Sequence, residues 1–173
     1  MALAEDVPDR PLDRVSDPEH RLQDALDLAY RYLGHRDRTV AEMRRHLEAK
    51  RVEPETIDDV IAELEATRYL DDGRYAKRFA EDKRAIDGWG AERIERRLLQ
   101  NGVGREHVAA ALREDDGHDE LAAARAILAR RFPGPFEDDR ARERALGHLV
   151  RKGYDLELAY DAVRAHHAGR DAA

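Results

Sequence analysis

The sequence predicts an all-α protein, built as an elongated array of three tandem three-helix repeats. Apolar residues recur at spacings of three and four, and the alternation typical of strands is absent. The chain also repeats itself, because Leu47, Leu98 and Leu149 stand 51 residues apart within similar apolar patterns. Aromatic residues make up only 6% of the 173 residues, which favours several small aliphatic cores over one deep core. Units of about 50 residues are marginal alone, so we expect neighbouring units to bury part of each other's surface.

The first repeat indicates its helix boundaries clearly. We expect its first helix over residues 19–33, with Tyr30 on the apolar stripe. The second helix begins after Thr39, which forms with Glu42 a T-x-x-E capping box. The third begins at Pro54, because proline is favoured in the first turn of a helix.

The same pattern recurs twice along the chain. We expect helices at 71–86, 91–100 and 105–114 in the second repeat, and at 119–132, 137–151 and 156–167 in the third. For the first helix of each repeat, an offset of 49 residues aligns Tyr30 with Phe79 and Leu128. The predicted domains are a disordered acidic arm over 1–18, three-helix repeats over 19–68, 69–116 and 117–168, and a tail over 169–173.

The composition excludes several classes of protein. Charged residues make up 40% of the chain, so much of it must lie in water. There is no cysteine, which excludes a disulfide framework and a thiolate metal site and suits a reducing compartment. No stretch approaches the roughly 18 apolar residues of a membrane span, and no apolar signal segment is present at the N-terminus. We therefore expect a cytoplasmic protein without a membrane partner.

Charge is unevenly distributed along the chain. The net charge of -7 lacks the basic signature of a dedicated nucleic-acid binder, yet the second helix of each repeat lies in a locally basic window. The candidate partner-binding residues are the basic side chains of these windows: Arg44, Arg45, Arg93, Arg96, Arg97, Arg142, Arg144, Arg151 and Lys152. Arginine pairs with carboxylates on proteins and with phosphates, so the charges alone leave both kinds of partner open.

Motifs for catalysis, metals and cofactors are weak. The paired Asp71 and Asp72 suit metal ligands or an acid and base, but we interpret them as caps, because a helix N-terminus favours acids. Trp89, the only tryptophan, is expected to pack in the seam between units rather than stack on a base. The glycines beside it indicate a turn, since no Walker or G-x-G-x-x-G pattern is present. We expect no catalytic site, no metal site and no cofactor.

Linked segments of the chain resemble a known family. YLDDGRYAKRF and GWGAERIERRLLQNGV resemble the central signature of the RecX regulatory proteins. TVAEMRRHLEAKRV and LGHLVRKGYDLELAYDAV are similar to the segments before and after it, so the likeness covers about residues 22–164. Two turn positions depart from the family: Ala91 stands where proline is frequent, and Arg51 where glycine is common.

The resemblance implies a curved helical array that binds the RecA recombinase and restrains it. RecX-like proteins lodge in the groove of the RecA filament on single-stranded DNA, contact more than one subunit and inhibit filament growth, ATP hydrolysis and strand exchange. Some members also bind DNA. We therefore expect a monomeric, non-enzymatic regulator of RecA in DNA repair and recombination, with possible weak direct DNA binding. Two alternatives stay open: a non-sequence-specific DNA-binding helical-repeat protein, and a helical scaffold with another partner.

Overall fold

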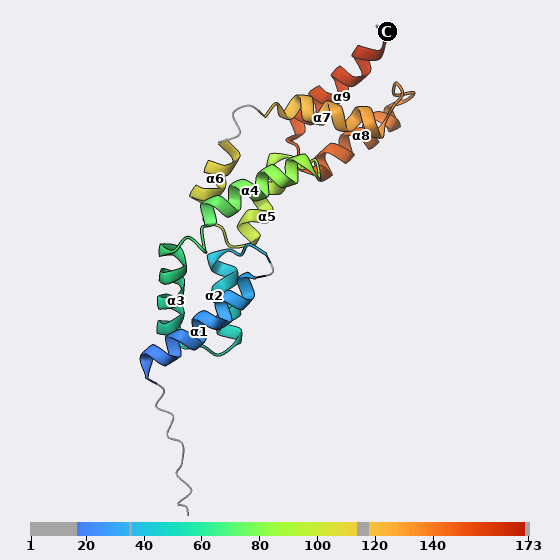
Figure 1. Ribbon diagram of the computed structural model, residues 1–173. Coiled ribbons are helices and arrows are strands. Elements are labelled where there is room, and N and C mark those ends of the chain that lie inside the picture. Colours follow the sequence, from blue (N-terminus) through green and yellow to red (C-terminus); the bar gives the residue numbers. More distant parts are fainter. Residues whose placement is uncertain (1–16, 35, 114–117, 172–173) are drawn as a thin grey trace, which may run out of the picture.

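The computed structural model describes residues 17–34, 36–113 and 118–171, the last five of them by backbone alone. Within these ranges the regular structure is entirely α-helical, which confirms the predicted fold class. The helices form three groups of three, and Figure 1 shows the groups following one another along an elongated molecule. The predicted acidic arm, up to residue 16, lies outside the described residues.

The first unit contains α1 (Pro18–Leu33), α2 (Val40–Ala49) and α3 (Pro54–Ala66). The predicted capping box is present at the start of α2. The Thr39 side chain accepts from the Glu42 backbone N–H at 3.1 Å, and the Thr39 N–H donates to the Glu42 carboxylate at 3.1 Å. Pro54 begins α3 as predicted. The three helices enclose an aliphatic core that includes the fully buried Met43.

The second and third units repeat this arrangement. The second contains α4 (Asp72–Ala85), α5 (Ala91–Gln100) and α6 (Arg105–Arg113), and the third contains α7 (Glu120–Arg131), α8 (Asp139–Lys152) and α9 (Leu156–Asp171). Asp71 caps α4 as interpreted, because its carboxylate accepts from the Arg74 backbone N–H at 2.8 Å. Each unit has its own cluster of buried residues, so the array contains three small cores.

The 51-residue repeat is confirmed in the second helices. Leu47, Leu98 and Leu149 are fully buried, one in each core. The offset of 49 residues for the first helices is wrong, because Tyr30 is 39% exposed. The buried positions are Ala25 and Ala29 in α1 and, 51 residues later, Ala76 and Ala80 in α4. In α7 they are Ala124 and Leu128, which stand 48 residues after those of α4. Alanine lets these helices pack closely, so the larger aromatic rings lie at the rim.

The joint between the first two units fixes the start of α2. The Thr39 hydroxyl donates to the carbonyl of Asn101, at the end of α5, at 2.8 Å. The Val40 N–H donates to the Asp72 carboxylate, in the first turn of α4, at 2.9 Å. Asp72 thus binds across the joint instead of capping its own helix.

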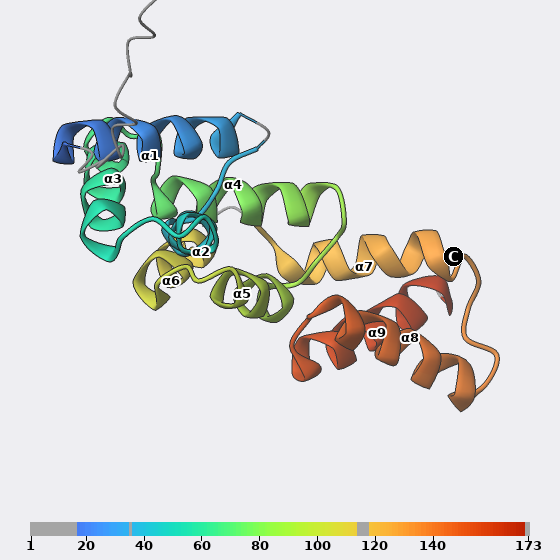
Figure 2. The same ribbon diagram turned by 90° about the horizontal axis from the view of Figure 1, so that it is seen from below.

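The joint between the second and third units repeats these bonds. The two N–H donors and the accepting carbonyl lie 51 residues after their counterparts in the first joint, and the accepting carboxylate lies 48 residues after its counterpart. The Gly90 N–H donates to the Lys152 carbonyl at 2.9 Å, and the Ala91 N–H donates to the Glu120 carboxylate at 3.0 Å. A proline at position 91 would lack this N–H, so the departure from the family supplies one of the bonds of the joint. Figure 2 shows the third unit continuing the line of the first two.

One or two residues after the end of each second helix the backbone is left-handed, with φ of 61° at Arg51, 86° at Gly102 and 89° at Gly153. Gly153 also has no room for a side chain, because an added Cβ would lie 2.2 Å from the Cβ of Arg93 in the preceding unit. Arg51 belongs to the first unit, and no earlier unit packs on it among the described residues. An arginine is therefore accommodated there at a backbone cost of about 1 kcal/mol.

Candidate functional site

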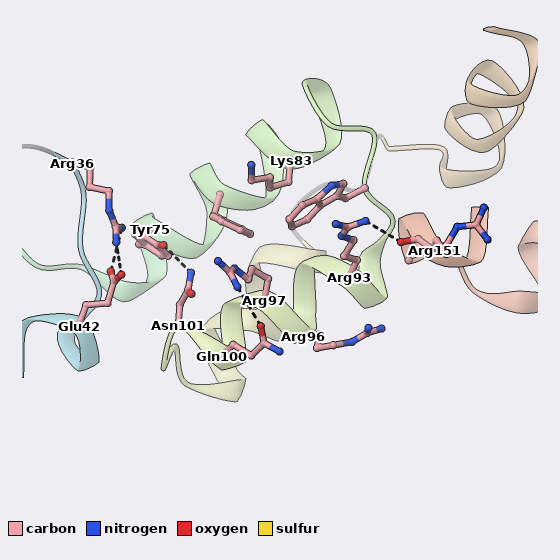
Figure 3. A pocket seen from close by; sticks show the side chains of 13 residues that line it. Arg36, Glu42, Tyr75, Lys83, Arg93, Arg96, Arg97, Gln100, Asn101 and Arg151 are labelled. Atoms are coloured by element: carbon pink, nitrogen blue, oxygen red, sulfur yellow. Dashed lines mark hydrogen bonds and ion pairs between the residues drawn. The ribbon is translucent and has the colours of Figure 1, made fainter. Parts of the chain in front are cut away.

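A groove of about 870 Å³ crosses the middle of the molecule and gathers four of the nine predicted partner-binding residues. Arg93, Arg96 and Arg97 line it from α5, and Arg151 lines it from the end of α8 (Figure 3). Two more basic residues complete the lining. We call this the cationic groove and define it by its basic side chains: Arg36, Lys83, Arg93, Arg96, Arg97 and Arg151.

Arg93 is the most firmly positioned of these side chains. Its guanidinium lies over the ring of Trp89, with the carbon Cζ 4.2 Å from the ring centroid. It also donates to the Arg151 carbonyl at 2.9 Å, so it spans the second joint. The second contact is made where Gly153 approaches α5 closely. The second joint therefore sets the position of the charge in this part of the groove.

Trp89 lines the groove and contacts two of its basic side chains. It is half-buried and packs against the core of the second unit, so its ring contacts lie within one unit and not in the seam between units as predicted. The ring of Phe79 meets it edge-on at 6.3 Å, and the Lys83 ammonium lies 5.0 Å from its centroid. Together with Arg93, these contacts surround the indole and hold two cations at the groove wall.

The end of the groove near the first unit is more nearly neutral. Arg36 forms a two-bonded ion pair with the carboxylate of Glu42, with its second bond at 3.3 Å. Burial raises the pKa of Glu42, but hydrogen bonds from Arg36 and the Thr39 backbone outweigh it, so the pKa lies below its usual value. Beside the pair, the Asn101 amide donates to the Tyr75 hydroxyl at 3.0 Å. Burial raises the pKa of Tyr75, which keeps this hydroxyl neutral.

The other end of the groove carries cations without acidic partners. Arg96 and Arg151 are exposed, and within the described residues neither forms a salt bridge. Arg97 is exposed too and donates only to the Gln100 amide oxygen, at 3.5 Å. These guanidinium groups face water in the free protein. They are available to an anionic partner.

The other five predicted residues lie outside the groove. Arg44 pairs with Asp58 at 2.6 Å on the surface of the first unit, and the Arg45 side chain bonds its own helix. Arg142 lines a separate hollow of about 660 Å³ on the third unit and pairs with Asp139, while Arg144 is exposed on α8. Lys152 donates to the Asp87 carbonyl at 2.6 Å across the second joint, which is a structural contact.

Sequence reasoning missed Arg36 and Lys83. Its signal was basic charge in the second helix of each repeat, whereas Arg36 precedes α2 and Lys83 lies in α4. Lys83 has a local clue, since it stands six residues before the tryptophan that it covers. Arg36 has a weaker one in its spacing to Glu42 of the capping box.

The described residues contain neither a candidate metal site nor a candidate membrane span. In the part of the chain that the structure describes, no three His, Asp or Glu side chains come together in a way that could hold a metal ion. No helix in that part has the length and apolar character needed to cross a bilayer.

The chain is similar to known proteins over its first two units and over most of its length. The family model for the first three-helix domain of RecX matches residues 25–64, and that for its second three-helix domain matches residues 71–112. The chain is 36% identical over 135 residues to the regulatory protein RecX of Trichlorobacter lovleyi, covering 75% of this chain and 87% of that protein. It is 30% identical over 161 residues to that of Deinococcus radiodurans, covering 93% and 75%.

Solved structures show the same fold. The crystal structure of RecX from Lactobacillus salivarius superposes with a TM-score of 0.75 and 17% identity, over 84% of this chain and 96% of that one. A second crystal structure of a regulatory protein RecX gives a TM-score of 0.71 at 20% identity, over 85% and 73%. Both superpositions extend beyond the two domains that the family models match.

Proposed function

This chain belongs to the RecX family of regulatory proteins, and from that membership we propose that it binds RecA filaments on single-stranded DNA and inhibits RecA. It acts as a monomeric, non-enzymatic cytoplasmic regulator that lodges in the filament groove and hinders filament growth and ATP hydrolysis. The observation that carries this proposal is the likeness to RecX regulators over most of the chain.

The shape of the molecule supports the proposal. Three units in line present a long surface, and the cationic groove takes residues from all three units, so a partner in it meets the whole array at once. The mechanism is mass action, because a protein that binds one state of a filament more tightly shifts the population towards that state.

DNA binding is the second candidate, and the cationic groove favours it. Five of its six basic side chains lack a carboxylate partner within the groove itself. A DNA-binding array predicts tight binding to bare DNA with a steep dependence on salt. The net charge of -7 opposes this, because a chain with an excess of acidic residues repels a polyanion overall.

The experiment is to measure ATP hydrolysis by preformed RecA filaments on single-stranded DNA while the protein is added at sub-stoichiometric ratios. We expect a progressive loss of hydrolysis. Binding to bare DNA, measured in the same buffer, is the control, and we expect it to be weak at the concentrations that inhibit RecA. Unchanged hydrolysis with folded protein would refute the proposal. Tight capture of bare DNA would move the function to the second candidate.

A further inference from the structure

The cationic groove is built for carboxylates presented by a protein chain. We propose that it binds an extended acidic peptide segment of the partner protein and does not read nucleic-acid phosphates or bases. This inference rests on the proposed function in that the partner is a protein filament. Four features carry it: the unpaired arginines of the groove, its partly covered rings, its free amide groups and the net negative charge of the rest of the chain.

The charge of the groove calls for an anion with spaced charges. Glu42 neutralises Arg36, and Lys83 pairs with Asp87 at 2.7 Å just outside the lining. The remaining positive charge is carried by guanidinium groups, of which Arg96 and Arg151 are exposed and have no salt bridge within the described residues. A guanidinium fork matches a carboxylate with two parallel hydrogen bonds.

The aromatic rings of the groove are half-buried and are covered in part by cations and by one another, which limits the surface on which a base could stack. The Trp89 ring is surrounded by Arg93, Lys83 and Phe79. Phe79 in turn stacks with Tyr75 at 6.0 Å, with Lys83 5.7 Å from its centroid. Proteins that bind single-stranded nucleic acids gain much of their affinity from bases stacked on open rings. The rings here hold the cations in place instead.

Two amide side chains match the backbone of a peptide. Asn101 uses its amide N–H towards Tyr75, and its amide oxygen accepts no hydrogen bond within the described residues. Gln100 uses its oxygen towards Arg97, which leaves its amide N–H groups unused there. The groove thus presents a free acceptor beside free donors. A peptide backbone carries both N–H and C=O groups, whereas a phosphodiester backbone carries only acceptors.

The net charge of the chain outside the groove disfavours a long polyanion. With six basic residues in the groove and a net charge of -7 overall, the rest of the chain is strongly acidic. Charges act over roughly 8–10 Å at physiological salt. A short acidic segment stays within the reach of the groove, while a long nucleic acid also feels the net negative charge of the rest of the chain.

The test compares two labelled probes by fluorescence anisotropy: a peptide of ten glutamates and a ten-nucleotide oligothymidine. We expect the native protein to bind the peptide at least about tenfold more tightly than the oligonucleotide. The double variant Arg96→Glu/Arg151→Glu should weaken peptide binding by at least about a hundredfold, since two exposed cations become repulsive. Circular dichroism checks that the helices remain, and both positions are exposed, so folding should not change.

The matched control is Arg45→Glu/Arg144→Glu. It changes the net charge by the same amount, and Arg45 occupies on α2 the position that Arg96 occupies on α5, but both residues lie outside the groove. Peptide binding by this variant should stay within about threefold of the native protein. Equal losses in the two variants would show attraction by overall charge and would overturn the assignment of the groove. Tighter binding of the oligonucleotide, lost in the groove variant, would assign the groove to phosphates instead, and binding of neither probe would refute it as an anion site.

The same variants separate this inference from the proposed function. Inhibition of RecA hydrolysis by the native protein, with equal inhibition by Arg96→Glu/Arg151→Glu, would leave the proposed function standing and overturn the groove as its contact. Peptide binding that only the groove variant loses, with no inhibition of RecA by the native protein, would support the ligand class and refute RecA as the target.

Discussion

The two joints of the array use equivalent positions but different chemical groups. At the first joint a side-chain hydroxyl, that of Thr39, makes the bond to the next unit. At the second joint the corresponding bond comes from the backbone N–H of Gly90, and the Glu92 N–H adds another to the Gly153 carbonyl at 3.1 Å. In both joints a carboxylate from the next unit accepts the following backbone N–H. The first joint is thus made mainly by side chains and the second mainly by the backbone.

The difference decides how closely the units approach. Two buried glycines, Gly90 and Gly153, bring the second and third units into backbone contact, and an added Cβ on Gly90 would lie 2.4 Å from the Gly153 carbonyl oxygen. Arg93 crosses this contact and enters the groove. The second joint therefore couples stability to the proposed contact surface through Arg93, whereas the bonds of the first joint involve none of the exposed arginines of the groove.

The largest effect is expected from Gly153→Ala at the second joint. The new methyl group would lie 2.2 Å from the Cβ of Arg93 and would force a side chain into a left-handed position, so we expect a loss of about 2–4 kcal/mol in the free energy of unfolding. Urea unfolding followed by circular dichroism measures it. Gly134→Ala is the control, because nothing lies within 4 Å of its added Cβ. A neutral Gly153→Ala would mean that the joint is looser than the structure shows.

Thr39→Ala breaks the first joint and should have an intermediate effect. It removes the helix cap of α2 and leaves the buried end of α5 without the donor to Asn101, at a combined cost of about 2 kcal/mol. Thr39→Ser keeps the hydroxyl and should recover most of this loss in the same unfolding experiment. Peptide binding at the groove should stay within about twofold, because the Thr39 side chain contacts neither Arg96 nor Arg151. Equal instability of the serine variant would assign the effect to the threonine methyl group.

Local signals in the sequence predict the units well and their joints poorly. Thr39 with Glu42, Pro54 and the repeated leucines define helix starts and cores, because caps and apolar spacing act within one unit. The groove depends on contacts between residues far apart in the chain, such as Arg93 with Arg151. No helical periodicity records that contact. The alignment of Tyr30 also failed for a physical reason, since buried alanines carry a weaker hydrophobic signal than an aromatic ring at the rim.

The smallest effect is expected at the titratable group of the first joint. Burial raises the pKa of Asp72 above its usual 3.8, although its bond from Val40 and the nearby His107 oppose the shift. The folded state therefore holds this proton more tightly than the unfolded chain, so the contribution of Asp72 to stability is present in acid and is lost as pH rises through the folded pKa.

Asp72→Asn keeps an oxygen for the Val40 N–H without the charge. It should raise the free energy of unfolding at pH 7 by up to about 1 kcal/mol, and the gain should vanish below about pH 4. Asp161→Asn is the control, because Asp161 belongs to an exposed ion pair with Arg164. Such pairs contribute about 0–1 kcal/mol, so the free energy of unfolding should change little. A gain for Asp72→Asn that persists unchanged in acid would show that the charge of Asp72 is not its cause, and the first joint would then differ from the second in geometry alone.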